Sequence, residues 1–229
     1  METATEIDVL APRETSFALD VDGAVARRRV LRRVDRSHEI DATLDRTFSG
    51  DPDLLAAFFA RLDAREQVLV RMAMHVSRHP SAMRFNAALN LLGNGWLYLM
   101  TLVCLPLAAG SAAFRPALAA GCAVGIAFVV YGLLKPFLAR TRPCDTHPTA
   151  AAYSKPLDKY SCPSGHTMTA TAIAIPLAIA FPFALPAIVM LALLIAWSRV
   201  ACGHHYPSDV LLGAMLGAAV AMPICGWIL

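Results

Sequence analysis

The chain has 229 residues, of which 57% are hydrophobic and 16% charged, and its formal net charge at pH 7 is +3. A mean hydropathy of +0.53 is too high for a typical soluble domain, so the composition indicates a membrane protein. The positive charges gather in the N-terminal part and around a later cluster instead of forming one stripe, which argues against nucleic-acid binding.

The first part of the chain is polar. Residues 1–50 start without a basic-then-apolar leader and hold a run of arginines between positions 27 and 36, so we expect a flexible, arginine-rich region. Residues 51–84 are predicted to form an amphipathic interfacial helix, because 52–78 has apolar side chains at helical spacing with charges between them. The sequence leaves open whether this helix lies on the membrane or packs on its neighbours.

Four uncharged stretches predict transmembrane helices, since about 20 apolar residues span the hydrocarbon core. They are 85–114, 117–134, 167–198 and 210–229. The third is long enough for two short spans, and Pro182 and Pro186 mark a turn between them. The predicted fold class is therefore all-α: a polytopic membrane helical bundle with five transmembrane helices, preceded by the amphipathic helix.

A cluster of polar side chains follows the fourth span. If the chain turns helical after Pro207, His205 and Asp209 lie one turn apart, so the carboxylate can orient the imidazole as a nucleophile or base. Arg199 supplies a planar, permanently charged fork, and a phosphate is the anion that uses such a fork best. This segment predicts phosphoryl chemistry.

Two further groups lie between the second and third spans. If the second helix continues to Pro143, Lys135 and Arg142 point toward one spot. In the sequence SCPSGH, Gly165 allows close approach of the backbone to an anion, Ser164 can cap the following helix, and His166 stands beside them as a proton donor. The remaining polar residues Asp158 and Tyr206 are taken as loop or surface positions.

Together these residues form three motifs: K-x6-R-P from Lys135, PSGH ending at His166, and SR-x5-H-x3-D from Ser198 to Asp209. All three are complete and in order, and residues 85–229 thereby resemble the type 2 phosphatidic acid phosphatase superfamily. Soluble bacterial acid phosphatases and vanadium haloperoxidases share these motifs, but the five predicted spans favour an integral-membrane member. The membrane-bound members generally have six spans, so the topology departs from the family pattern.

The resemblance implies a role for each motif residue. His205 would attack phosphorus to give a phosphohistidine, Asp209 would orient it, and His166 would protonate the leaving oxygen and later activate water. The remaining motif side chains would hold the phosphoryl oxygens, so that no metal or other cofactor is needed. These phosphate-binding residues are Lys135, Arg142, Ser164, Gly165 and Arg199.

The expected substrate is a lipid phosphate or diphosphate, because a site at the ends of the spans meets lipid headgroups. Phosphatidic acid, phosphatidylglycerol phosphate, polyprenyl diphosphates and lipid A phosphates all fit. Three alternatives stay open: a lipid phosphotransferase, a non-catalytic lipid-phosphate binder, and a metal-dependent hydrolase that uses the cysteines and histidines. The sequence also leaves open the oligomeric state and a disulfide between Cys144 and Cys162.

The expected location is the plasma membrane of a bacterium. Two spans separate the N-terminal region from the first motif, so that region and the site should share a side of the membrane. The arginine-rich N-terminal region favours the cytoplasmic side, whereas many members of the family place the site outside. The sequence does not decide between them.

Overall fold

The computed structural model describes residues 52–146 and 156–229, and every regular element in these ranges is helical. The all-α prediction is confirmed for this part of the chain, whereas the predicted flexible region 1–50 lies outside it. The longer helices, in chain order, are α2 (Pro52–Val76), α3 (Pro80–Leu91), α6 (Phe114–Leu138), α8 (Gly165–Ala180), α9 (Leu185–Ala201) and α10 (Pro207–Ile228). The shorter ones are α4 (Leu97–Leu99), α5 (Leu105–Ala109) and α7 (Pro143–Thr146).

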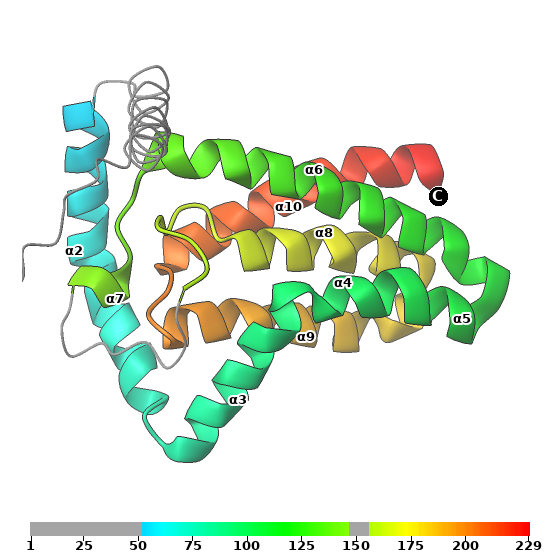
Figure 1. Cartoon of the computed structure of the whole chain (residues 1–229), viewed down its shortest axis with the longest axis horizontal. Coiled ribbons are helices and arrows are strands. Elements are labelled where there is room, and N and C mark those ends of the chain that lie inside the picture. The colour runs from blue at the N-terminus through cyan, green and yellow to red at the C-terminus, as the bar shows by residue number, and fades with distance from the viewer. Residues whose placement is uncertain (1–51, 147–155) are drawn as a thin grey trace, which may run out of the picture. The chain divides into compact units, whose positions relative to one another are not determined.

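The helices α6, α8, α9 and α10 run side by side along one axis, with α8 packed against the other three (Figure 1). Their buried contacts consist mainly of small residues, such as Ala120, Ala123 and Ala172, together with Met168 and Ile173. Small side chains let helix backbones approach closely. Helices in a membrane pack in this way because lipid is as apolar as the side chains and gives the helices no hydrophobic reason to associate. The ends of α6 and α9 and the beginnings of α8 and α10 meet at the same end of this bundle.

The first predicted span is a broken helix. It begins at Pro80, and two π-helical turns, Leu92–Trp96 and Met100–Cys104, interrupt it before it ends at Ala109. Within the first turn Asn94 leaves the helical conformation and Gly95 has a φ of 132°, which favours glycine. The first predicted span is therefore helical and apolar but not regular, and its break lies beside the site described below.

Within the described residues, three helical stretches are long and apolar enough to cross a membrane: Pro80–Thr146, Pro182–Ala201 and Pro207–Ile228. The first of them contains the broken helix and α6, which a 3-10 turn at Gly110–Ala113 separates. The helix α8 is apolar but shorter, and α9 follows it after a turn at Pro182–Ala184, where the sequence predicted one. This arrangement matches a polytopic membrane protein.

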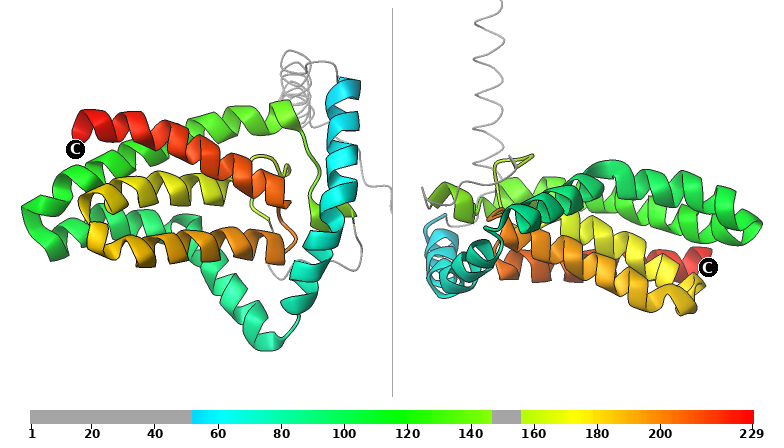
Figure 2. Two further views of the ribbon diagram at one scale, coloured as in Figure 1. Left: turned by 180° about the vertical axis from the view of Figure 1, so that it is seen from behind. Right: turned by 90° about the horizontal axis from the view of Figure 1, so that it is seen from below.

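The helix α2 lies across the end of the bundle, at a large angle to the bundle helices (Figure 2). It packs there through Val70 and Ala73, which are buried with Val200 of α9. Other apolar side chains of α2, including Phe58 and Met72, remain exposed. The helix therefore packs on its neighbours, and its contact with the membrane surface stays a prediction that the crosswise orientation favours.

Close packing of α8 against α10 depends on two glycines of α10. A Cβ atom at Gly213 would lie 2.6 Å from the carbonyl oxygen of Ser164, and one at Gly217 would overlap the carbonyl oxygen of Met168. We expect Gly217→Ala to lower the stability of the detergent-solubilised protein by about 1–3 kcal/mol, the usual cost of overpacking. Thermal unfolding checks this, with Gly226→Ala as the control because a Cβ there meets nothing within 4 Å. Equal unfolding midpoints for the two variants would contradict the prediction.

Candidate active site

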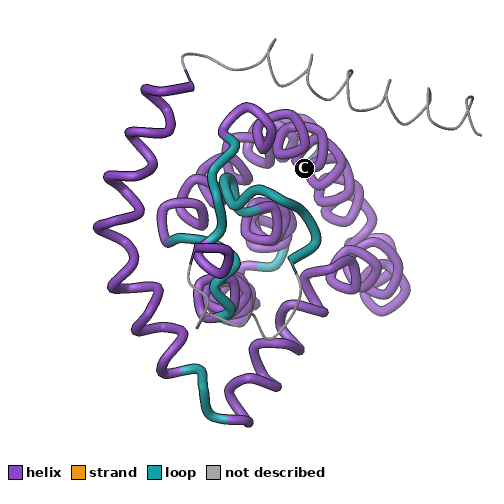
Figure 3. Tube along the Cα trace, turned by 60° about the vertical axis from the view of Figure 1, so that its left-hand side comes forward, coloured by secondary structure: helices purple, strands orange, loops and turns teal. Residues whose placement is uncertain are grey.

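A cavity of about 340 Å³ opens at the end of the bundle where α8 and α10 begin. Figure 3 shows the loops that gather over this end. The cavity lining combines residues from all three sequence motifs, and those of the predicted site are Lys135, Arg142, Gly165, His166, Arg199 and His205. Segments that are far apart in the sequence thus place three cations and two histidines around one space.

Lys135 and Arg142 reach the cavity from the two sides of a tight turn. The helix α6 ends at Leu138, and Ala139 adopts a left-handed conformation with a φ of 44°. The prediction that Lys135 and Arg142 point toward one spot assumed that this helix continues to Pro143. That assumption was wrong, because the chain turns at Ala139, before it reaches Arg142. Both cationic side chains nevertheless line the same cavity.

Asp158 bridges these two cations within the cavity. Its Oδ2 accepts a hydrogen bond from Nζ of Lys135 at 2.7 Å, and its Oδ1 accepts one from Arg142. Arg142 also donates to the backbone oxygens of Asp158 and Tyr160, at 3.0 and 2.7 Å. Asp158 is an exposed loop residue, as predicted, but it also supplies the counter-charge that two neighbouring buried cations need.

Arg199 lies in the last turn of α9 and is buried. One Nη atom donates to Oδ1 of Asn90, and the amide nitrogen of Asn90 donates in turn to Sγ of Cys202 at 2.9 Å. The Nε atom of Arg199 is buried without a hydrogen-bond partner among the described residues. A buried, unpaired guanidinium N–H beside the cavity is suited to an anionic oxygen.

His166, in the first turn of α8, is held by the broken helix. Its Nε2 lies 2.5 Å from Oδ1 of Asn94, so Nε2 is the donor in this contact. Gly93 makes room for the ring, since a Cβ atom there would lie 2.6 Å from Cδ2 of His166. The interruption of the helix at Asn94 and Gly95 therefore has a local consequence, which is to position His166 at the cavity.

His205 and Asp209 are neighbours, but the expected hydrogen bond between them is not formed. Nδ1 of His205 lies 3.7 Å from Oδ2 of Asp209, whereas that oxygen accepts from the backbone N–H of Tyr206 at 2.9 Å. Tyr206 is fully buried, so its placement at the surface was wrong. Burial and the nearby Arg199 charge hold the pKa of His205 well below its ordinary value, which keeps the ring neutral.

Ser164 and Gly165 begin the central helix α8. Ser164 occupies the N-cap position, but its hydroxyl lies 3.0 Å from that of Thr167 and caps no backbone N–H. The expected side-chain cap was therefore wrong, and Ser164 is buried behind the cavity that Gly165 lines. The first turn of α8 still directs its positive dipole end toward this region.

Comparison with known proteins was made on the sequence and on the fold. The family model described as the PAP2 superfamily matches residues 116–228. Decaprenylphosphoryl-5-phosphoribose phosphatase of Mycobacterium tuberculosis is 36% identical over 126 residues, which cover 55% of this chain and 67% of the relative. This chain belongs to the PAP2 superfamily. It is thus a membrane phosphatase of the PAP2 type, as the motifs predicted.

Two further comparisons place the chain among PAP2 proteins. A lipid A 1-phosphatase of Rhizobium johnstonii is 34% identical over 104 residues, which cover 41% of this chain and 43% of that protein. A transmembrane PAP2 type phosphatidylglycerolphosphate phosphatase from Bacillus subtilis has the same fold, with a TM-score of 0.60 and 22% identity over 82% of this chain and 94% of its own. The names of these proteins give different lipid phosphates, so the similarity does not single out one substrate.

Sequence reasoning on the three PAP2 motifs missed the two asparagines that hold motif residues. Asn90 and Asn94 are one helical turn apart in an otherwise apolar segment, and Asn86 precedes them by another turn. Buried polar residues at helical spacing in a predicted span are a recognisable signal for an internal polar contact. Read in that way, the spacing would have indicated that this face of the first span turns toward the site.

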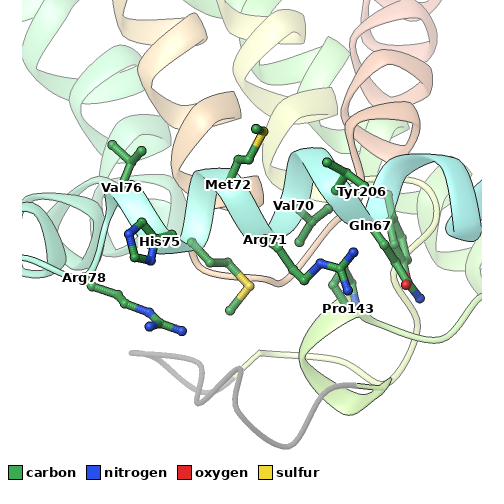
Figure 4. Close-up of a pocket in the computed structure, with 11 residues that line it drawn as sticks. Gln67, Val70, Arg71, Met72, His75, Val76, Arg78, Pro143 and Tyr206 are labelled. Atoms are coloured by element: carbon green, nitrogen blue, oxygen red, sulfur yellow. The ribbon is translucent and has the colours of Figure 1, made fainter.

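The cysteines form neither a disulfide nor a metal cluster in the described part of the chain. None of the six is disulfide-bonded, Cys144 and Cys162 included, and the described residues contain no group of three or more acidic, histidine or cysteine side chains that could hold a metal. A cavity of about 430 Å³ lies along α2 (Figure 4), with Arg71, His75 and Arg78 in its wall. It contains none of the motif cations or histidines.

Proposed function

We propose that this PAP2 protein hydrolyses the phosphate monoester or diphosphate of a membrane lipid through a phosphohistidine on His205, without a metal. The observation that carries the proposal is the convergence of Lys135, Arg142 and Arg199 with two histidines on one cavity. Several buried cations in a low-dielectric setting repel one another, and an anionic phosphoryl group relieves that repulsion. A binder has no need of a nucleophile with an adjacent carboxylate.

In the proposed reaction a nitrogen of His205 attacks phosphorus while the bond from phosphorus to the lipid oxygen breaks. His166, as the imidazolium, gives a proton to that oxygen, and the leaving group departs as the lipid alcohol from a monoester or as the lipid monophosphate from a diphosphate. Arg199, with its unpaired Nε, binds the phosphoryl oxygens together with Lys135 and Arg142, where charge develops. Water then attacks the phosphohistidine with His166 as base, which releases phosphate and restores His205.

The substrate is proposed to be a lipid because the cavity is lined by residues at the ends of apolar helices. A headgroup phosphate at the membrane surface would reach it there. The relatives are named for decaprenylphosphoryl-5-phosphoribose and lipid A 1-phosphate, and both chemistries belong in a substrate panel. A bacterial plasma membrane remains the proposed location.

The test is phosphate release from a panel of lipid monophosphates and diphosphates by the detergent-purified protein in EDTA. The proposal expects turnover that EDTA does not reduce, with free phosphate as product. Loss of activity in EDTA that a divalent metal restores would identify a metal-dependent hydrolase. A phosphorylated second lipid as product would identify a phosphotransferase, and phosphate-lipid binding without turnover would identify a binder.

Asp158 is expected to compete with the substrate phosphate for Lys135 and Arg142. Its carboxylate already bonds both cations, so Asp158→Asn should make orthophosphate a tighter inhibitor by about tenfold, which corresponds to about 1.4 kcal/mol. The inhibition constant of orthophosphate checks this. Asp145→Asn is the control, because Asp145 is an exposed carboxylate of the short helix α7 and lies outside the cavity lining. Weaker inhibition of the Asp158 variant would instead mean that the carboxylate orders the cations for phosphate.

A further inference from the structure

Arg140 occupies an unspecified position of the K-x6-R-P motif and lies outside the cavity lining. Its side chain is buried, and every N–H of its guanidinium is engaged. Nε and Nη2 donate to Oδ1 of Asp63, and Nη2 also donates to Glu66. Nη1 donates to Oγ of Ser208 at 2.7 Å and to Oδ1 of Asp209 at 2.5 Å. One cation thus connects two carboxylates of α2 with the carboxylate proposed to orient the nucleophile.

Arg140 fixes Asp209 on the side opposite to His205. One carboxylate oxygen of Asp209 bonds Arg140, and the other accepts from the Tyr206 N–H and lies 3.7 Å from Nδ1 of His205. The guanidinium itself is held over the Tyr206 ring at 4.0 Å and the Phe59 ring at 5.0 Å. Arg140 and the Tyr206 N–H hold the Asp209 carboxylate from two sides. The position of Arg140 therefore helps to set the distance between Asp209 and the imidazole of His205.

The helix α2 anchors the arginine through two acidic residues on one face. Asp63 and Glu66 are three residues apart in α2, and their side chains are only 16% and 13% exposed. Glu66 also accepts from the backbone N–H of Ser208 at 2.9 Å and from its hydroxyl at 2.7 Å. It therefore binds the first turn of α10, where an acidic group interacts favourably with the helix dipole.

These contacts attach α2 to the helix that carries Asp209. The family match covers residues 116–228, so both acidic residues come from a segment outside it. The helix belongs to the same compact unit as the bundle, Phe48–Leu229. An amphipathic helix that only rested on the membrane would not need two partly buried carboxylates directed at one internal arginine.

We propose that Arg140 is a positioning residue for the reaction, and that α2 acts through Asp63 and Glu66 to hold Arg140 and the start of α10 in place. This inference rests on the proposed function, in which His205 needs Asp209 beside it. Arg140 does not touch the substrate in this account. Its loss should therefore lower the rate of the chemical step and leave phosphate binding unchanged.

The kinetic test compares Arg140→Gln and Arg140→Lys with the wild-type protein. We expect Arg140→Gln to lower kcat by about 10²-fold, the scale of a catalytic group displaced by about 1 Å. KM and the inhibition constant of orthophosphate should stay unchanged, and the lysine variant should recover part of kcat. Arg65→Gln is the control, since Arg65 is an exposed arginine of α2 next to Glu66. An unchanged kcat, or a loss confined to KM, would overturn the proposal.

Hydrogen–deuterium exchange supplies a second measurement that does not need turnover. The N–H groups of Tyr206 and Ser208 are bonded to Asp209 and Glu66, so Glu66→Gln should raise exchange in residues 204–210 and leave α8 unchanged. This variant keeps Arg140 and tests the network even if Arg140→Gln does not fold. Unchanged exchange would contradict the proposal that Glu66 holds the start of α10 in place. Absent turnover in the wild-type protein would instead contradict the proposed function.

Discussion

His205→Ala is expected to abolish phosphate release from lipid phosphates, with kcat lower by roughly 10⁴-fold or more, the scale seen when an enzyme loses its nucleophile. The imidazole is 1% exposed and lines the cavity with the three cations. Its pKa is lowered by burial and by Arg199, so the ring is neutral and able to attack phosphorus at the pH of the assay. Its Nδ1 lies 3.7 Å from Oδ2 of Asp209.

The measurement is the rate of phosphate release under saturating substrate. His75→Gln is the matched control, because His75 is an exposed histidine of α2 and should be replaceable without effect on kcat. The orthophosphate inhibition constant should change little in His205→Ala, since the cations that bind phosphate remain. Wild-type activity in His205→Ala would exclude this residue as the nucleophile.

His166→Gln is expected to slow hydrolysis of lipid substrates by about 10² to 10⁴-fold, the range for loss of a general acid or base. A lipid alcohol is a poor leaving group that needs a proton, whereas nitrophenolate leaves without one. Formation of the phosphorylated enzyme from p-nitrophenyl phosphate should therefore be affected much less than its formation from a lipid phosphate. His166 is placed for this role by its contact with Asn94.

A single-turnover measurement with the two substrates separates this role from a structural one. Equal slowing with both leaving groups would contradict general acid catalysis and assign His166 to phosphate binding or to folding. Asn94→Ala should show a weaker form of the same dependence on the leaving group, because it removes the contact that orients the ring. Thr101→Val is a useful control nearby, since the Thr101 hydroxyl donates to the backbone oxygen of Leu97 at 2.8 Å and Thr101 does not line the cavity.

The sequence predicted the bundle and the chemical groups of the site because both leave local signals. Uncharged runs mark the helices, and the charged and histidine residues at their ends stand out against them. The prediction was weaker for features that depend on where the backbone turns or a helix breaks. The left-handed residue Ala139 turns the chain before Arg142, and the break at Asn94 brings a polar side chain to His166. The spacing of Asn86, Asn90 and Asn94 indicates which face of the first span turns toward the site, but it does not indicate His166 as the partner, and no pattern marks the turn at Ala139.

Long-range ion pairs were also beyond the reach of sequence patterns. Asp158 lies in a polar loop, and nothing in its neighbourhood indicates that it bonds both Lys135 and Arg142. In the sequence, Arg140 likewise looks no different from the other cations near helix ends. In the structure it pairs with Asp63, which lies on a helix far away in the sequence. Such pairs depend on which helix ends meet, and that is a property of the folded bundle.

The most direct test of the central claim is to trap the phosphorylated enzyme. The purified protein would be mixed with a labelled lipid phosphate in EDTA, quenched in alkali and digested, and the site of phosphorylation located by mass spectrometry. The account predicts a phosphoryl group on His205 that is stable in alkali and lost in acid, and that is absent from His205→Ala. Turnover by the wild-type protein with no phosphorylated histidine, or with the label on another residue, would contradict it.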